Sequence, residues 1–190
     1  NWQACQGLAV AQRTVLTDLF TSTNGAGWTN KTNWNGAPGT ECTWFGVVCD
    51  AAQSNVVAIN LGGNNLVGTL PAISGLTALQ SFNVFNNKLT GTIPSLTGLT
   101  ALQSIDVSGN SAGGGNLLTG PIPSLTGLTN LRFFRADFNQ LTGTIPSFTG
   151  LTNLVSFSAA SNQLTGAIPS LAGLTVLQFL QVPGNQLTGT

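Results

Sequence analysis

The sequence contains no histidine and very little charge. Five basic and five acidic side chains occur in 190 residues, so charged residues make up 5% and the formal net charge is zero. Without histidine, neither a Ser-His-Asp nor a Cys-His catalytic arrangement can form, and no His/Cys cluster has the spacing of a metal site. The lack of a basic face argues against nucleic-acid binding, which requires phosphate neutralisation. We therefore predict a non-enzymatic protein without a cofactor, a metal or a nucleic-acid partner.

Methionine and long apolar runs are also missing. No apolar run approaches the roughly 20 residues that a membrane helix needs, so we expect no membrane span in this chain. The chain begins at Asn1 and contains no methionine, which we interpret as a mature chain whose signal peptide has been removed.

Cysteines are few, and all three precede residue 50: Cys5, Cys42 and Cys49. Their confinement to one end of the chain favours an oxidising compartment. Cys42 and Cys49 enclose a short loop that a disulfide could close, which would leave Cys5 over unless it pairs with one of them. Asn30, in Asn-Lys-Thr, is the one acceptor sequence for N-glycosylation.

The most abundant feature of the chain is a repeated stretch of 23 residues. LTGTIPSLTGLTAL at 89–102 returns in altered form at 66–79, 118–131, 141–154 and 164–177. The units begin at Val56, Leu79, Leu102, Leu131, Leu154 and Leu177, and the third is longer because Ser111 to Asn116 add six residues. A fixed period of this length predicts a solenoid in which neighbouring units share one core.

Each unit follows the pattern L-x-x-F-x-V-x-x-N-x-L-x-G-x-I-P-x-L-x-x-L-x-x. Apolar residues at positions 1, 4 and 6 predict a short strand with one inward face. The pattern closely resembles the plant-specific type of leucine-rich repeat, whose hallmark is LxxLxLxxNxLxGxIP. Over residues 56 to 190 the resemblance implies a curved, right-handed α/β solenoid, mostly β. One parallel sheet is expected on the concave side, with irregular or 3₁₀ segments on the convex side.

The asparagine at position 9 of every unit is predicted to be structural. A side chain at this position turns inward, and its amide can bond the backbone of adjacent turns. The predicted ladder consists of Asn64, Asn87, Asn110, Asn139, Asn162 and Asn185.

Residues 1 to 55 lack the repeat and are predicted to form an N-terminal cap. Apolar residues at helical spacing predict a helix over about residues 6 to 21, followed by a Trp-rich loop. We interpret the tryptophans as a cover over the open end of the core, with a sugar site as the alternative. All four lie in this part: Trp2, Trp28, Trp34 and Trp44.

The run CTWFGVVC resembles the N-terminal cap of plant-type leucine-rich-repeat proteins and their microbial relatives. The resemblance implies a disulfide between Cys42 and Cys49. Many plant members carry a further cysteine, joined to an N-terminal one, at the place that Glu41 occupies here. We therefore expect Cys5 to be unpaired or to form an intermolecular bond.

Positions 2, 3, 5, 7 and 8 of the units are expected to point out of the sheet and to form what we call the concave face. This face holds four of the five charged residues after residue 50, the fifth being Lys88, and four phenylalanines. Aromatic and arginine side chains are enriched at binding hot spots. The candidate ligand-binding residues are Phe85, Asp106, Arg132, Phe133, Arg135, Asp137, Phe138 and Phe179.

The alternative is that these side chains only stabilise the sheet. Arg135 would then pair with Asp106, and the phenylalanines would stack. The separation of Asp106 and Asp137 could also suit a glycosidase. However, Arg135 is expected next to both and would keep both ionised, so a salt-bridge cluster is the better interpretation.

A row of threonines suggests a function of another class. Stacked turns would bring them about 4.8 Å apart, on a flat, uncharged surface similar to that of some ice-binding solenoids. The alternative is that they are part of the repeat consensus, and Val67, Pro121 and Ala167 interrupt the row. The row comprises Thr90, Thr92, Thr119, Thr142, Thr144, Thr165, Thr188 and Thr190.

Our leading prediction is a secreted or cell-surface recognition module, periplasmic if bacterial, that binds a protein, peptide or glycan through its concave face. The resemblance implies such roles, because plant-type repeats occur in receptor ectodomains and in secreted inhibitors of wall-degrading enzymes. Ice binding, or a structural role in a wall or filament, is the alternative. The final unit stops at Thr190, so we expect either further repeats after it or contact between two chains at this end.

Overall fold

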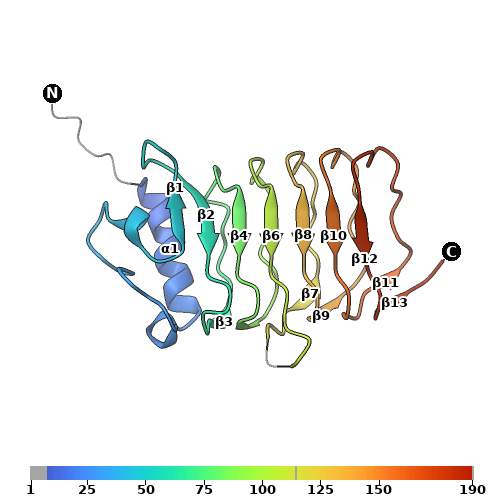
Figure 1. Cartoon of the computed structure of the whole chain (residues 1–190), viewed down its shortest axis with the longest axis horizontal. Coiled ribbons are helices and arrows are strands. Elements are labelled where there is room, and N and C mark those ends of the chain that lie inside the picture. The colour runs from blue at the N-terminus through green and yellow to red at the C-terminus, as the bar shows by residue number, and fades with distance from the viewer. Residues whose placement is uncertain (1–7, 114, 190) are drawn as a thin grey trace.

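The computed structural model describes residues 8 to 113 and 115 to 189. The chain winds into an elongated solenoid, with a helical cap at its N-terminal end (Figure 1). A seven-stranded sheet runs through the molecule in the order β1-β2-β4-β6-β8-β10-β12. Its strands are β1 (Val47–Cys49), β2 (Val56–Asn60), β4 (Ser81–Asn83), β6 (Ser104–Asp106), β8 (Phe133–Arg135), β10 (Ser156–Ser158) and β12 (Phe179–Gln181).

The strands from β2 to β12 are parallel, and each pairs with the strand one unit later. This register places position 4 of every unit in one row: Ile59, Phe82, Ile105, Phe134, Phe157 and Leu180. All of these except Leu180 are at most 1% exposed, because alternate side chains of a strand point to opposite faces. The predicted solenoid with a parallel sheet and a helical cap is confirmed.

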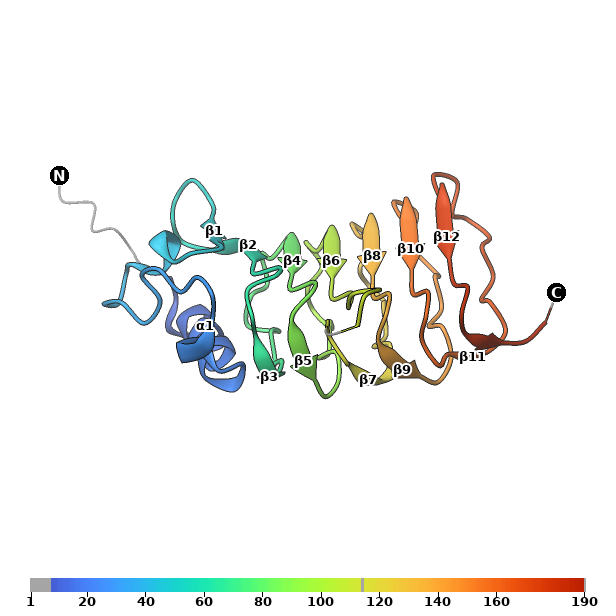
Figure 2. The same cartoon turned by 60° about the horizontal axis from the view of Figure 1, so that its bottom comes forward.

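A second series of short strands, which the sequence analysis did not predict, lies on another side of the solenoid (Figure 2). The strands pair as three two-stranded parallel sheets, β3–β5, β7–β9 and β11–β13. They form because the extended turns bring backbone groups into reach, as where the Thr119 N–H donates to the Gly91 carbonyl over 2.7 Å. Their bounds are β3 (Val67–Thr69), β5 (Lys88–Thr90), β7 (Thr119–Pro121), β9 (Gln140–Thr142), β11 (Thr165–Gly166) and β13 (Gln186–Leu187).

Buried asparagines tie each turn to the preceding one. Nδ2 of Asn87 donates to the carbonyl oxygens of Leu61 and Val84, and its Oδ1 accepts from the Leu66 N–H. The amide thus satisfies backbone groups that the core would otherwise leave unpaired. Equivalent bonds to two successive turns are made by Asn116, Asn139, Asn162 and Asn185. At the first turn, Asn64 exchanges bonds with the backbone of Asn30 in the cap.

Asn110 does not belong to this ladder, contrary to the prediction. Asn116 takes its place and is 1% exposed, whereas Asn110 is exposed and donates to Oδ1 of Asn86. The extra residues of the third unit are therefore 110 to 115, before the ladder asparagine. The signal was present in the sequence, because Asn116 precedes Leu118 by two residues, as each of the other ladder asparagines precedes a leucine.

The cap contains the helix α1 (Val10–Ser22), which buries Val15, Leu16 and Leu19. The helix begins later than predicted, because Ala9 has an extended backbone with φ −53° and ψ 144°. Two 3₁₀ turns follow, η1 (Gly25–Gly27) and η2 (Glu41–Thr43).

Three tryptophans of the cap pack into one aromatic cluster with Phe20. The ring centroids of Trp28 and Trp34 lie 4.8 Å apart, and those of Trp34 and Trp44 lie 5.0 Å apart. All three indoles are at most 8% exposed, and each indole N–H donates a hydrogen bond within the cap. They therefore cover the end of the core, as we interpreted them, while Trp2 lies outside the described residues.

Two bonds close the loop between the helix and the sheet. A disulfide joins Cys42 to Cys49, as the family resemblance implied, while Cys5 lies outside the described residues. Glu41, 1% exposed, forms an ion pair with Arg13 of α1 and also accepts from the Gly39 N–H. Burial alone would raise the pKa of Glu41, but hydrogen bonds from backbone N–H groups and from Arg13 lower it below its usual value.

We predict that the turn between β1 and β2 loosens in strong acid. Hydrogen bonds from the Asn55 side chain and the Ser54 N–H lower the pKa of Asp50 to about 2 from 3.8. Because the folded pKa is the lower one, Asp50 stabilises the fold fully above about pH 4 and loses this contribution as the pH falls through about 2. An NMR titration of the carboxyl group should have its midpoint near 2, and a midpoint near 3.8 would contradict the assignment. In the wild type, the Ser54 amide should lose protection from hydrogen exchange as the pH falls from 4 to 2. In Asp50→Asn, its protection should stay unchanged over this range.

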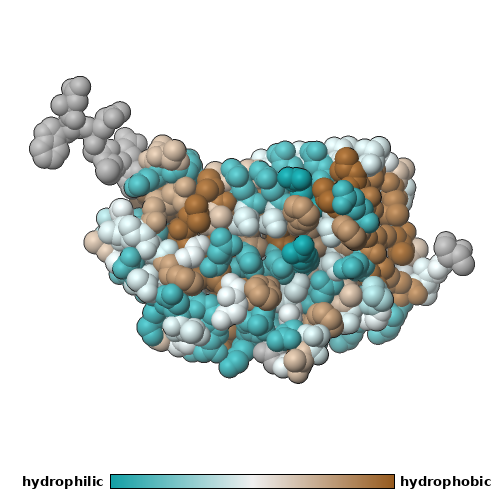
Figure 3. Space-filling view, viewed as in Figure 1, coloured by the Kyte–Doolittle hydropathy of each residue, from teal (hydrophilic) through white to brown (hydrophobic). Residues whose placement is uncertain are grey.

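The last turn exposes much apolar surface, visible as a brown patch beside the C-terminal end in Figure 3. Exposed apolar side chains there include Ile168, Leu171, Val176 and Phe179, and Leu177, Leu180 and Leu187 are only partly buried. Among the described residues, no further strand pairs with β12. No helix in the described part of the chain is long and apolar enough to cross a bilayer.

Candidate binding surface

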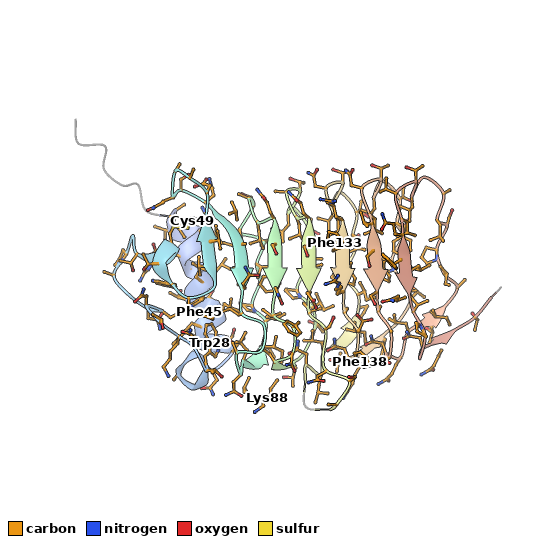
Figure 4. All side chains as sticks on the ribbon, viewed as in Figure 1. Trp28, Phe45, Cys49, Lys88, Phe133 and Phe138 are labelled. Atoms are coloured by element: carbon orange, nitrogen blue, oxygen red, sulfur yellow. A yellow bond between two sulfur atoms is a disulfide. The ribbon has the colours of Figure 1, made fainter. Side chains whose placement is uncertain are left out.

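Strands β6 and β8 carry the charged centre of the concave face. Asp106 is the register partner of Arg135, and Oδ2 of Asp106 lies 3.9 Å from Nη1 of Arg135. The guanidinium groups of Arg132 and Arg135 lie 5.5 Å and 5.9 Å from the ring centroid of Phe133. Phe133 therefore holds two cations at its ring (labelled in Figure 4). The pairing of Arg135 with Asp106 is the one expected under the alternative that these side chains stabilise the sheet.

Asp137 lies beside this centre but has different partners from those expected. The sequence placed Arg135 next to both carboxylates, yet in the described structure the ion pair of Arg135 is with Asp106. Oδ1 of Asp137 instead accepts from the Ser158 hydroxyl and from the Ala160 N–H. One carboxylate is thus balanced by a cation, and the other is held only by neutral donors.

Two hollows flank the charged centre at opposite rims of the concave face. The upper-rim hollow has a volume of about 430 Å³ and is lined by Gln103, Asn130, Arg132, Asn153, Val155 and Val176. The lower-rim pocket has a volume of about 290 Å³ and is lined by Phe85, Asn86, Ser108, Gly109, Asn110, Ser111, Asp137 and Phe138. Figure 4 shows Phe138 at the lower rim, next to the loop of the third unit.

The candidate residues do not form one continuous site. Phe85, Asp137 and Phe138 meet in the lower-rim pocket, whereas Phe179 is 55% exposed on β12, two strands beyond β8. Sequence reasoning missed Asn110 and Ser111 as lining residues. Their position in a glycine-rich insert directly after concave positions 7 and 8 was the available signal.

The threonine row lies on the second series of strands. Thr90, Thr92, Thr119, Thr142, Thr144, Thr165 and Thr188 are exposed, while Thr190 lies outside the described residues. Their pairing differs from the predicted straight columns, because position 14 of one unit faces position 12 of the next. Examples are Thr69 with Thr90, Thr92 with Thr119 and Thr144 with Thr165.

No cluster of three or more His, Cys, Asp or Glu side chains that could hold a metal ion occurs in the described residues. Asn30 is half-buried, and its Oδ1 accepts from the backbone and hydroxyl of Thr32. Its glycosylation stays a prediction.

Comparisons with known proteins point to one family. A family model described as Leucine Rich Repeat matches residues 78–99. The LRR receptor-like serine/threonine-protein kinase ER2 of Oryza sativa subsp. japonica is 43% identical over 51 residues, which are 26% of this chain and 5% of the kinase. The match thus spans only a small part of that relative.

Solved structures share the fold over nearly the whole chain. The ectodomain of the receptor kinase SOBIR1 from Arabidopsis thaliana matches with a TM-score of 0.77 and 23% identity, over 95% of this chain and 96% of its own. The Arabidopsis receptor kinase HAESA, in complex with the peptide hormone IDA and the co-receptor SERK1, has a TM-score of 0.76 and 33% identity, over 95% and 30%. A plant ice-binding protein has a TM-score of 0.79 and 27% identity, over 96% and 58%.

The parallel sheet, the asparagine ladder and the disulfide-bonded helical cap define a leucine-rich-repeat solenoid. Its repeats are leucine-rich repeats of the plant-type pattern, and its fold is that of plant receptor ectodomains.

Proposed function

We propose that the chain is an extracellular recognition module that binds a peptide or protein through its concave face. The observation that carries this proposal is the clustering of charge. Arg132, Arg135 and Asp106 gather around Phe133. Of the five charged residues after residue 50, only Lys88 lies outside the concave face. The extracellular setting is supported by the Cys42–Cys49 disulfide.

The physical argument is that this arrangement adds little to the stability of the fold. The side chain of Arg135 is 54% exposed, and an exposed ion pair contributes at most about 1 kcal/mol. Exposed Arg and Phe side chains contribute far more when a partner covers them, since such residues dominate binding energy at interfaces. HAESA, a structural neighbour, was solved with a bound peptide hormone, which supports a peptide as the first ligand class to test.

We expect an Arg132→Ala/Arg135→Ala double variant to lose its partners. Wild type, the double variant and Lys88→Ala would be immobilised and used to capture proteins and peptides from the native extracellular fluid. Lys88 lies on β5 of the second series. Lys88→Ala is therefore the control, because it removes a positive charge outside the concave face. Recovery should fall about tenfold or more for the double variant only, because hot-spot arginines contribute about 2 kcal/mol or more. Equal recovery by all three proteins would remove the arginine cluster from the proposal.

Ice binding is a second candidate, supported by the exposed threonine row and by the TM-score of 0.79 to a plant ice-binding protein. Neighbouring strands about 4.8 Å apart would present threonine pairs at a regular spacing, although Val67, Pro121 and Ala167 interrupt them. Inhibition of ice recrystallisation that is lost in Thr92→Lys/Thr144→Lys but kept in the arginine double variant would favour this candidate. The reverse result would assign any ice activity to the concave face.

A further inference from the structure

We propose that the lower-rim pocket binds a basic side chain, lysine or arginine, of an extended peptide or protein segment. This inference deepens the proposed function and rests on it. A basic group is expected at this end of the concave face, whereas the arginines at its centre would attract an acidic group.

The pocket is a slot in which one unit lacks large side chains. The third unit has Ser108 and Gly109 where the second has Phe85 and the fourth has Phe138. A Cβ at Gly109 would lie 1.9 Å from the Phe138 carbonyl oxygen, so the backbones of the third and fourth units are in close contact here and only glycine fits. Neighbouring strands lie about 4.8 Å apart, so the backbones that carry the two walls are separated by about 10 Å.

Phe138 has a conformational cost that a glycine at the same position would avoid. Its φ is +53°, in the left-handed region, where a bulky residue is a genuine outlier. The turn of the repeat imposes this backbone, because the same position is left-handed in four other units, at Gly63, Asn86, Ser161 and Gly184, with φ between +51° and +68°. The ring is nevertheless 41% exposed, so burial does not explain it. A bulky residue at a turn position that favours glycine, with its ring exposed beside a pocket, supports a role of Phe138 in binding.

Asp137 supplies the charge. Among the described residues, Asp137 forms no ion pair, while Asp106 is balanced by Arg135. Its Oδ1 is held by Ser158 and Ala160, and no described side chain or backbone group donates to Oδ2. A carboxylate fixed through one oxygen leaves the other to accept a charge-assisted bond from a ligand.

The rim of the pocket is preformed. Asn110, the first inserted residue, donates to Oδ1 of Asn86 over 3.0 Å, and Ala112 N–H donates back to Oδ1 of Asn110 over 2.9 Å. On the opposite side, the Phe85 ring packs over Gly62, where an added Cβ would lie 2.5 Å from the ring. The insert and the two aromatic walls therefore hold the slot open without a ligand.

A basic side chain satisfies all of these features. Its methylene stem can pack against Phe85 and Phe138, and its cation can reach the carboxylate of Asp137. Arg132 does not oppose it, because five strand residues, about 16 Å, separate it from Asp137 along the chain. Arg135 is nearer, but its charge is paired with that of Asp106. An anionic group would be repelled, and a neutral one would leave the carboxylate without a counter-charge.

The test uses two probes of equal length that differ in charge. N-acetyl-lysine N-methylamide and N-acetyl-norleucine N-methylamide would be titrated into the ¹⁵N-labelled full chain, and the amide shifts of Ser108, Gly109 and Asn110 followed. We expect the lysine probe to bind at this site about tenfold or more tightly than the norleucine probe. Asp137→Asn should remove that difference while keeping the bonds from Ser158 and Ala160, since the amide oxygen also accepts.

Phe138→Gly is the second variant, because glycine occupies this position, with a left-handed backbone, in the first and sixth units. It should weaken binding of the lysine probe several-fold while thermal stability is kept or raised, a combination that a merely structural ring would not give. Equal shifts with both probes, no shifts at the three amides, or unchanged lysine binding in Asp137→Asn would each overturn the inference. None of these results affects the arginine cluster, whose capture experiment tests the concave face independently.

Discussion

Asn116→Ala is expected to lower the free energy of unfolding by about 2–4 kcal/mol. The Asn116 side chain accepts from the Leu89 N–H and donates to the carbonyl oxygens of Val84, Val107 and Ser108. Its loss leaves the Leu89 N–H buried without a partner, which costs about 1–3 kcal/mol, and removes one donor from each carbonyl. The carbonyls suffer less, since Val84 and Val107 also accept from Asn87 and Asn139.

The matched control is Asn110→Ala, six residues earlier in the same unit. Asn110 is exposed and bonds only polar groups at the rim, so its replacement should change stability by at most about 0.5 kcal/mol. Urea denaturation with equal m-values would measure both effects. A larger loss in Asn110→Ala than in Asn116→Ala would restore the ladder that the sequence alone predicted.

Arg13→Ala is expected to cost about 3–5 kcal/mol, the usual range when one partner of a buried ion pair is removed. Glu41 is 1% exposed, and the charge of Arg13 is the one that balances it. Arg13 also donates from Nη2 to the Gly36 carbonyl over 2.8 Å, and its guanidinium lies 5.2 Å from the Trp44 ring centroid. The variant therefore loses the link between α1 and the loop and leaves a carboxylate buried without its cation.

Two further variants separate the charge from the packing. Arg13→Met/Glu41→Leu removes both charges and keeps apolar bulk, and such replacements are often neutral or stabilising, so most of the lost stability should return. Arg132→Ala removes an exposed arginine and should have an effect within about 0.5 kcal/mol. Thermal unfolding of all four proteins measures the differences. If Arg13→Ala were no less stable than Arg132→Ala, the ion pair would not hold the cap.

Much of the fold was predictable because the same residue pattern recurs in every unit of the repeat. The inward row at position 4 follows from apolar alternation, and the register Phe82–Ile105–Phe134 follows from the common period. The pairing of Cys42 with Cys49 came from the resemblance of the cap and not from the residues themselves. The prediction at Asn110 was wrong because the insert breaks the period there, and only the two-residue spacing from Asn116 to Leu118 marks the ladder position.

The binding surface was predictable only in part. The repeat pattern places positions 2, 3 and 5, here Arg132, Phe133 and Arg135, on the outward face, and the structure brings them together. It does not reveal which carboxylate receives the cation, because the choice between Asp106 and Asp137 depends on side-chain rotamers and on competing donors such as Ser158. The pocket beside Phe138 was likewise hidden, since it arises from three consecutive units and an insert.

The sequence by itself thus determined the solenoid, its period, its inward rows and the face that carries charge, because these depend on local alternation and on repetition. The tertiary structure alone decided the slanted pairing of the threonines, the ion pair between Arg13 and Glu41, and the slot between Phe85 and Phe138. Each of these depends on which groups from different turns approach within a few ångströms. Such distances are set by packing of the whole chain and not by any one stretch of it.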